Sequence, residues 1–336
     1  MENVVNTFWK DKSVLVTGAG GFIGSNLTKY LVNQNASVTV LLRSNNYRSP
    51  LFIHSLEKCV NIINGDIRNI DDVCYAVSRF DSEYVFHLAA QPVVTKALND
   101  PLVTLEDNIR GTYNVLEACR KYIDQIKSAT IASSDKAYGD VQAPPFVETM
   151  NVSGRHPYDV SKACGDMICQ AYAHSYGLPI SIARCGNVYG EGDLHWTRII
   201  PGAIKAYLKN ERPLIRSNGT LTRDYVFVSD IVRAYAMLGQ HTAETESRGD
   251  AFNFATGVPT SVNTVLELLQ SLCNSDLEPI YLDQAKSEIS HQSLVSAKAA
   301  AVLGWKAKVP MDEGLSQTVQ WYSKYFESQT SERYSC

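Results

Sequence analysis

Apolar runs alternate with segments of helical periodicity through the first half of the chain, and this alternation is the strongest constraint on the fold. Each run is apolar at consecutive positions, whereas a strand with one face in water would alternate apolar and polar residues. Strands buried on both faces belong to a parallel sheet covered by helices on both sides. The pattern therefore predicts an α/β fold with a doubly wound parallel sheet, whose strands lie near 13–18, 37–42, 60–65, 84–90, 128–134 and 180–187.

The alternation becomes irregular beyond about Tyr189, where the stretches 190–196 and 215–225 have the composition of loops. Loops carried by a rigid scaffold commonly bind substrates. We therefore expect a first domain over 1–188 that contains the sheet and a smaller C-terminal α/β subdomain over 189–330 that binds a substrate. Part of the second segment, about 225–260, is expected to return to the first domain.

Composition excludes several classes of partner. The net charge of −4 gives no general attraction to nucleic acid or anionic lipid. No stretch reaches the roughly 18 apolar residues of a membrane span, and the N-terminal residues lack a secretory apolar core, so we expect a cytoplasmic protein. The eight cysteines include no CxxC pair and no Cys/His cluster at zinc spacing, which predicts reduced thiols and no metal site.

Glycines gather directly after the first predicted strand. Gly18, Gly21 and Gly24 form GxxGxxG, and the helix that follows begins near Phe22 and Ile23. At this place in a parallel sheet, amides at a helix N-terminus can bind a pyrophosphate, and glycine permits both the tight turn and the close approach of the ligand. The motif predicts a dinucleotide site formed by these five residues, with a purely structural turn as the alternative.

The end of the second predicted strand bears on the choice between NAD and NADP. A free ribose 2'-hydroxyl is commonly bound by an acid there, but the chain has Leu42 and Arg43, with Ser44 and Arg48 nearby. This arrangement suits a 2'-phosphate and somewhat favours NADP over NAD; a solvated basic loop is the alternative. Asp66, after the third run, could accept from the adenine amine or could cap a helix.

Tyr158 and Lys162 form YxxxK, a spacing that places both side chains on one face of a helix. A nearby ammonium stabilises a phenolate, so Lys162 is expected to lower the pKa of Tyr158 towards neutrality and make it a base for an alcohol proton. About one such match is expected by chance in a chain of this composition. The position of this YxxxK match in the chain supports a catalytic role, because Ser134 ends a predicted strand before it and can hydrogen-bond the same substrate hydroxyl.

The glycine turn, the strand-end serine and YxxxK, in this order, resemble the extended short-chain dehydrogenase/reductase family. The stretches HLAAQPVV, SSDKAYG, GRHPYDVSK, ARCGNVYGEGDL and TRIIPGAIKAY are similar to its nucleotide-sugar 4,6-dehydratases, above all the CDP-glucose branch, which carries Asp-Lys as at Asp135 and Lys136. The stretch TRDYVFVSD is more similar to UDP- and dTDP-sugar enzymes, which leaves the nucleotide base open.

The resemblance implies a Rossmann-type sheet, a tightly bound NAD(P), a nucleotide-diphosphate hexose as substrate, and a homodimer built on two helices. It implies that Tyr158 takes the C4 hydroxyl proton while the nicotinamide accepts the C4 hydride, and that loss of water across C5 and C6 and return of hydride to C6 follow. Asp135 would protonate the leaving oxygen, and Lys136 would be the C5 base or a stabiliser of the enolate. Further implied contacts are Ile67 and Ala89 to the cofactor and Gln91, Asn187 and Arg223 to the substrate.

Two other functions remain open at this stage. A sugar-nucleotide 4-epimerase uses the same C4 oxidation but has no use for an acid and a base at C6 and C5. A nucleotide-binding regulator would keep the cofactor pocket without turnover, which the intact Ser134, Tyr158 and Lys162 disfavour. His87, within an apolar run, is interpreted as a core histidine rather than a catalyst, and Cys164 and Cys169 as packing residues.

Overall fold

A seven-stranded parallel sheet forms the centre of the molecule, with strand order β10-β6-β5-β4-β1-β2-β3. The computed structural model describes residues 7–140, 143–245, 248–284 and 290–333. The predicted α/β doubly wound sheet is confirmed, and each of the six predicted strands is present. The strands are β1 (Ser13–Thr17), β2 (Ser37–Leu42), β3 (Asn61–Asn64), β4 (Tyr84–His87), β5 (Ser128–Ala132), β6 (Ile180–Cys185) and β10 (Asp250–Phe254).

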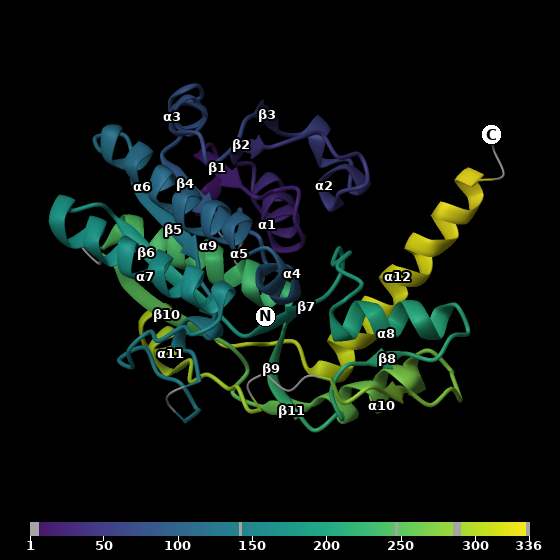
Figure 1. Cartoon of the computed structure of the whole chain (residues 1–336). Helices are drawn as coiled ribbons and strands as arrows, with labels where there is room; N and C mark the ends of the chain where they lie inside the picture. The colour runs from purple at the N-terminus through teal and green to yellow at the C-terminus, as the bar shows by residue number, and fades with distance from the viewer. Residues whose placement is uncertain (1–6, 141–142, 246–247, 285–289, 334–336) are drawn as a thin grey trace.

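Helices cover both faces of this sheet (Figure 1). One face is covered by α1 (Phe22–Asn33) and α9 (Val228–Glu244), which pack against each other. The other is covered by α3 (Ile70–Ser78), α6 (Gly111–Lys121) and α7 (Pro157–Tyr176). Shorter elements connect them: α2 (Pro50–Ile53), α4 (Val94–Asn99), α5 (Pro101–Leu105) and a π-helical turn (Glu106–Arg110) that runs into α6.

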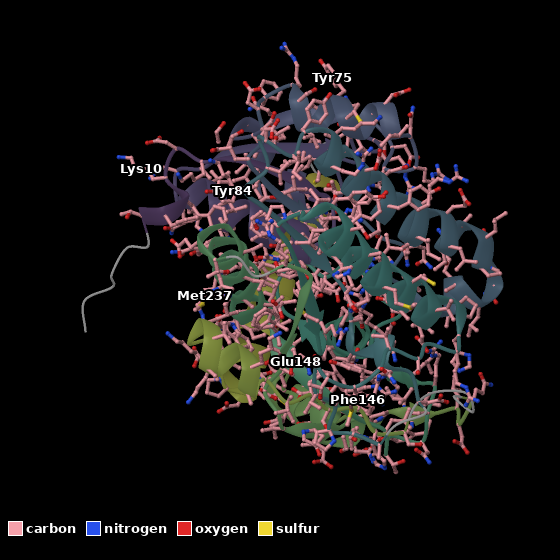
Figure 2. All side chains as sticks on the ribbon, turned by 90° about the vertical axis from the view of Figure 1, so that its left-hand side faces the viewer. Lys10, Tyr75, Tyr84, Phe146, Glu148 and Met237 are labelled. Carbon is pink, nitrogen blue, oxygen red and sulfur yellow. The ribbon has the colours of Figure 1, made fainter. Side chains whose placement is uncertain are left out.

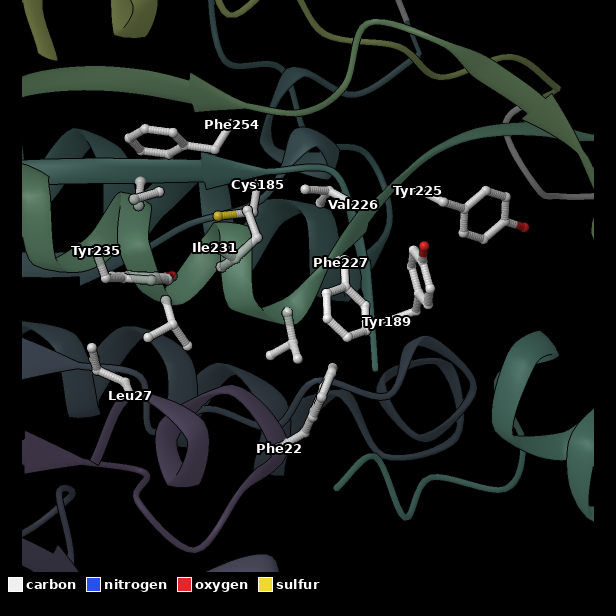
Figure 3. Close-up of a cluster of buried hydrophobic side chains, with 14 of the residues drawn as sticks. Phe22, Leu27, Cys185, Tyr189, Tyr225, Val226, Phe227, Ile231, Tyr235 and Phe254 are labelled. Atoms are coloured by element: carbon white, nitrogen blue, oxygen red, sulfur yellow. The ribbon is translucent and has the colours of Figure 1, made fainter. Parts of the chain in front are cut away.

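Two hydrophobic layers result, because successive residues of a strand point to opposite faces. On β1, Val14 and Val16 join the cluster on the α1 and α9 side, whereas Leu15 joins the cluster on the α3, α6 and α7 side. Full burial of each such side chain contributes about 1.5–3 kcal/mol. Figure 3 shows side chains of the first layer, among them Phe22 of α1 and Ile231 of α9. The continuous apolar runs in the sequence are therefore strands with two buried faces.

The N-terminal turn η1 (Thr7–Trp9) closes one end of the first layer. Trp9 is fully buried, and its ring meets that of Tyr84 edge-on with the ring centroids 5.1 Å apart. Tyr84 and the neighbouring Lys10 are labelled in Figure 2. Within the ranges that the structure describes, no helix combines the length and the hydropathy required to cross a membrane.

A second, smaller unit follows β6. Its three-stranded sheet contains β7 (Asn187–Tyr189), β9 (Thr222–Phe227) and β11 (Pro259–Ser261), and β8 (Leu214–Ile215) pairs with β12 (Ile280–Tyr281). Three helices pack around these strands: α8 (Ile199–Leu208), α10 (Val262–Leu272) and the C-terminal α12 (Met311–Arg333). Between β9 and β11 the chain returns to the large sheet as α9 and β10, and α11 (Ala297–Leu303) packs beside β10.

Candidate active site

The glycine turn after β1 requires glycine for two physical reasons. Gly18 has φ +78°, and a Cβ at this position would lie 2.5 Å from the backbone nitrogen of Ala89. A Cβ on Gly24 would collide with the carbonyl oxygen of Gly18, so α1 can approach the turn only because this position has no side chain. The turn is thereby held against the end of β4, where Ala89 follows the strand.

The N-terminus of α1 has the features of an anion site. Its N-cap is Gly21, which supplies no side-chain hydrogen bond, and no acidic residue lies in the first turn. The first amides of a helix have no partner within the helix and carry the positive end of its dipole. Phe22, Ile23 and Gly24 of this turn line the large cavity of the protein. These residues fit the pyrophosphate of a dinucleotide.

Charged residues surround the expected adenosine end of this cavity. Arg43 directly follows β2, is 63% exposed, and has its Nη1 3.4 Å from a carboxylate oxygen of Asp107. Asp66 pairs with Arg68 at 2.6 Å, and the hydrogen bond from Arg68 is the main reason why the pKa of the Asp66 carboxyl is lowered. The alternative reading of Asp66 as a helix cap is wrong, since Asn69 caps α3.

The strand-end serine begins a short turn that carries the acid and the lysine. Ser134 is the N-cap of the 3-10 helix η4 (Asp135–Tyr138), and its Oγ accepts a hydrogen bond from the backbone nitrogen of Lys136 at 3.3 Å. The same hydroxyl donates to Asp135 Oδ1 at 2.9 Å. Asp135 is only 3% exposed and Lys136 is half-buried; both line the cavity.

Tyr158 and Lys162 lie one turn apart on α7, and both are buried. Lys162 Nζ donates to the carbonyl oxygen of Ala132 at 2.8 Å, which directs the ammonium to the end of β5. Burial raises the pKa of Tyr158 to about 12, whereas the spacing alone had suggested a value near neutrality. Burial also lowers the pKa of Lys162 to about 8. The physical reason is desolvation, which disfavours both charged forms.

Arg198 is a cation that the sequence analysis did not assign. It is the N-cap of α8, lines the cavity, and pairs with Asp193 at 3.0 Å. Its charge opposes the effect of burial on the Tyr158 pKa, as does a hydrogen bond between the Tyr158 and Ser134 side chains. The sequence analysis cited the stretch TRIIPGAIKAY, which contains Arg198, for its similarity to the family but gave Arg198 no role. No local pattern in this stretch indicates that Arg198 lies near Tyr158.

Asp159 also reaches the cavity, although its place beside Tyr158 in the sequence gave no role for it. It is buried, and burial raises the pKa of its carboxyl, against the lowering effect of the positive charge of Lys136. Within the described part of the chain, its Oδ1 has no hydrogen-bond partner. A second carboxyl group therefore lies close to Lys136, in addition to Asp135.

The expected substrate residues line the far side of the cavity. Asn187 is on β7, and Arg223, on the adjacent β9, is buried and donates to the carbonyl oxygen of Thr222 at 2.8 Å. Gln91 differs from the expectation in its bonding, because its amide nitrogen donates to Val93 and Thr104 within the protein. Both hydrogens of that amide are used, so Gln91 shapes the wall of the cavity.

His87 is bonded on both ring nitrogens, as expected for a core histidine. Nδ1 lies 2.7 Å from Thr17 Oγ1 and Nε2 lies 3.2 Å from Thr112 Oγ1. Burial lowers its pKa to about 3, with a smaller effect of Lys162. Cys169 is buried on α7 and Cys164 is partly exposed; both are free thiols.

An ion pair beneath the catalytic turn links it to β6. Asp166 and Arg184 pair at 3.0 Å with both side chains almost completely buried. Asp166 Oδ2 accepts from Ser133 Oγ at 2.7 Å, and Arg184 donates to the hydroxyl of Tyr138 at 2.9 Å. Ser133 and Tyr138 flank Asp135 and Lys136 on either side, so the ion pair fixes both ends of this turn.

One cavity of about 1330 Å³ brings the predicted site residues together. It is lined by every residue that the sequence analysis proposed for catalysis, cofactor or substrate: Gly18, Gly21, Phe22, Ile23, Gly24, Arg43, Asp66, Ile67, Ala89, Gln91, Ser134, Asp135, Lys136, Tyr158, Lys162, Asn187 and Arg223. Among the described residues, no group of three or more His, Cys, Asp or Glu side chains is arranged to hold a metal ion.

The chain is similar to known proteins over most of its length. The model of the NAD dependent epimerase/dehydratase family matches residues 14–255. A putative UDP-glucose 4-epimerase of Methanocaldococcus jannaschii is 32% identical, over 92% of this chain and 97% of that protein. A CDP-glucose 4,6-dehydratase of Salmonella typhimurium is 27% identical, over 96% of this chain and 93% of that protein.

A solved structure shows the same fold. The UDP-glucose 4-epimerase of Thermotoga maritima, determined with UDP-glucose, aligns with a TM-score of 0.85 at 30% identity, over 94% of this chain and 99% of that one. The predicted resemblance to extended short-chain dehydrogenases/reductases is confirmed by these matches. On the evidence of both its sequence and its fold, this chain is an enzyme of the NAD dependent epimerase/dehydratase family.

Proposed function

We propose that this enzyme is a nucleotide-sugar 4,6-dehydratase. Its substrate would be a nucleotide-diphosphate hexose of the CDP-glucose type, and its product the corresponding 4-keto-6-deoxyhexose. Residues 1–188 would bind the cofactor and carry the catalytic groups, and 189–330 would mainly bind the substrate, apart from the portion around 225–260. Asn187 and Arg223 would bind the diphosphate, for which a guanidinium offers paired hydrogen bonds.

The placement of Asp135 and Lys136 is the observation that carries this proposal. Both follow Ser134 on η4 and line the same cavity as Tyr158. Asp135 is buried and Lys136 is half-buried, so neither side chain is turned out into bulk water. Oxidation and reduction at C4 alone would need no further acid or base at this place, whereas elimination across C5 and C6 uses an acid at the C6 oxygen and a base or a stabilising charge near C5.

In the first step, Tyr158 takes the proton of the C4 hydroxyl. Ser134 bonds the same oxygen, and Lys162 provides positive charge at the end of β5. When bound, the oxidised nicotinamide accepts the hydride from C4 and later supplies it to C6. The residues of this chain therefore orient the alcohol and remove its proton, which leaves a 4-keto sugar.

The second step uses the acidity that the C4 ketone gives to the C5 hydrogen. The C5–H electron pair forms the C5–C6 double bond while the C6–O bond breaks. Asp135 donates a proton to the leaving oxygen, which departs as water. Lys136 receives the C5 proton if its amine is neutral; if Lys136 instead stabilises the enolate as an ammonium, the carboxylate of Asp159 in the same cavity receives that proton. Reduction at C6 and protonation at C5 then give the methyl group.

The chemical structure of the product distinguishes a dehydratase from a simple dehydrogenase and from an epimerase. The purified protein would be incubated with CDP-, GDP-, dTDP- and UDP-hexoses and followed by mass spectrometry and proton NMR. We expect one of these substrates to lose one water and gain a C6 methyl doublet without net consumption of cofactor, because the hydride returns. Stoichiometric accumulation of reduced cofactor would contradict the proposal.

A 4-epimerase is the second candidate. Two similar proteins favour this function: the Methanocaldococcus jannaschii relative is described as a putative UDP-glucose 4-epimerase, and the Thermotoga maritima structure as a UDP-glucose 4-epimerase. The same experiment separates the two functions, since an epimerase would leave the CH2OH group intact and invert C4. Asp135 and Lys136 would then have no chemical role in turnover.

We further propose that the cofactor is NADP rather than NAD, although the family is named for NAD. Arg43 supports this, because it directly follows β2, where an acid would otherwise bind the ribose hydroxyl, and it is largely exposed. Substitution Arg43→Ala is expected to weaken NADP binding about tenfold or more and to leave NAD binding unchanged. Fluorescence titration of both cofactors measures this; tighter binding of NAD by the unaltered protein would contradict it.

A homodimer is the expected assembly. On the sheet face covered by α6 and α7, Met167 of α7 and Leu102 of α5 are apolar and exposed. Two copies that pair through this face would bury both side chains. Light scattering should give twice the 37.2 kDa mass of one chain, and Met167→Glu should shift it towards one chain. A monomeric mass for the unaltered protein would refute this assembly.

A further inference from the structure

A glutamine far along the chain contacts the lysine of the catalytic turn. Gln292 Oε1 accepts a hydrogen bond from Lys136 Nζ at 3.0 Å, across 156 positions of sequence. Gln292 is 0% exposed, and Lys136 lines the cavity. We propose that Gln292 is the positioning residue of the elimination step, which holds the Lys136 nitrogen towards C5 and C6 of the hexose. This inference rests on the dehydratase function proposed above.

The segment around Gln292 is anchored on two sides. Its backbone nitrogen donates to Thr222 at 3.2 Å, and the nitrogen of Thr222 donates to Ser290 at 3.0 Å. On the other side, the nitrogen of Phe146 donates to Ser293 at 2.9 Å; Phe146 is labelled in Figure 2. The amide of Gln292 therefore projects from a backbone with fixed position, as a positioning residue requires.

The same segment is tied to the catalytic turn through apolar packing. Leu294 is buried in a small cluster with Phe146 and Tyr138, and Tyr138 is the last residue of η4. The rings of Tyr138 and Phe146 stack with their centroids 4.9 Å apart. The donor Lys136 and the acceptor Gln292 are thus carried by two segments that share one core, so their separation is set by the fold.

The orientation of the Gln292 amide also points to Lys136. In the part of the chain that the structure describes, its buried Nε2 has no hydrogen-bond partner. A buried unpaired donor lowers stability, and turning the amide over would set that donor against the Lys136 nitrogen. The amide of Gln292 therefore lowers stability at a position where an apolar side chain would pack. In return, the protein gains the hydrogen bond between Gln292 and Lys136.

Two carboxyl groups explain why Lys136 needs to be held. Asp135 is its neighbour in the chain, and Asp159 lies close enough for the charge of Lys136 to act on its pKa. An unrestrained lysine would turn to one of them, because opposite charges in a poorly solvated site attract strongly. A close pair with Asp135 would occupy the group that protonates the leaving oxygen. The neutral acceptor of Gln292 keeps the amine away from that carboxyl.

Substitution Gln292→Met tests the role, because it retains the length and removes both polar atoms. Single-turnover experiments would follow C4 oxidation by absorbance of the reduced cofactor and elimination by C5 deuterium uptake and methyl formation. We expect elimination to slow about tenfold, the effect of losing one hydrogen bond to a charged group. C4 oxidation should keep its rate, and the unfolding midpoint should not fall. Ser293→Ala, in the same segment, is the matched control and should alter neither step.

Substitution Gln292→Glu keeps an acceptor oxygen at the same length but adds a negative charge that favours the ammonium form of Lys136. It should recover part of the lost elimination rate if Lys136 stabilises the enolate, and slow elimination further if Lys136 is the C5 base; in both cases C4 oxidation should keep its rate. Equal slowing of both steps together with a lower unfolding midpoint would show a merely structural role. Unchanged elimination in Gln292→Met would also overturn the inference. Should the unaltered protein form a C4 epimer and no methyl product, the proposed function itself fails, before any variant is compared.

Discussion

Substitution Tyr158→Phe is expected to lower kcat by about 10²- to 10⁴-fold, the usual contribution of a general base. The ring remains, so the buried pocket on α7 keeps its shape, but no group is left to take the C4 proton. Both steps depend on the ketone formed first. Single-turnover absorbance of the reduced cofactor and methyl formation should therefore fall together, in contrast to the expected effect at Gln292.

The pH dependence has a definite sign. Burial raises the pKa of Tyr158 to about 12, so the phenolate fraction, and with it the rate of C4 oxidation, should rise with pH below that value. A positive charge beside the ring would move the rise to lower pH. The Tyr158→Phe protein should lose this slope.

Tyr207 offers a matched control for the removal of a phenol oxygen. Its hydroxyl is buried on α8 without a hydrogen-bond partner among the described residues, and the residue does not line the cavity. Tyr207→Phe should leave kcat unchanged. Turnover by Tyr158→Phe at the rate of this control would exclude Tyr158 as the base.

Substitution Asp166→Ala is expected to lower the free energy of unfolding by about 3–5 kcal/mol, because it leaves Arg184 buried without its partner. The variant also removes the acceptor of Ser133 Oγ, one of the two contacts that hold the catalytic turn from beneath. Denaturant unfolding followed by fluorescence measures the stability, provided that the transition is reversible.

A partly exposed ion pair serves as the comparison for this loss of stability. Glu106 and Arg110 are paired one helical turn apart with side chains that are 36% and 46% exposed, so Glu106→Ala should cost only about 0–1 kcal/mol. Combining Asp166→Ala with Arg184→Met should recover much of the stability, since no unpaired charge then remains. Equal costs for Asp166→Ala and Glu106→Ala would show that burial of the pair is not decisive.

Much of the fold was accessible from local patterns. The six apolar runs are strands because consecutive apolar residues mark two buried faces, and all six occur where they were expected. The seventh strand, β10, was not assigned as a strand, because five residues between a long helix and a loop carry little periodic signal. Its place beside β6 depends on α9, which brings the chain back to the large sheet.

The sequence by itself determined the parallel sheet, the glycine turn and the spacing of Tyr158 and Lys162, because each is a matter of neighbouring residues and of short periods. Only the tertiary structure decided the environment of these groups. The pKa of Tyr158 follows from burial and from Arg198, forty positions away, and the contact of Lys136 follows from Gln292 in the last part of the chain. Desolvation and long-range contacts depend on which segments meet in space, and no local pattern encodes that meeting.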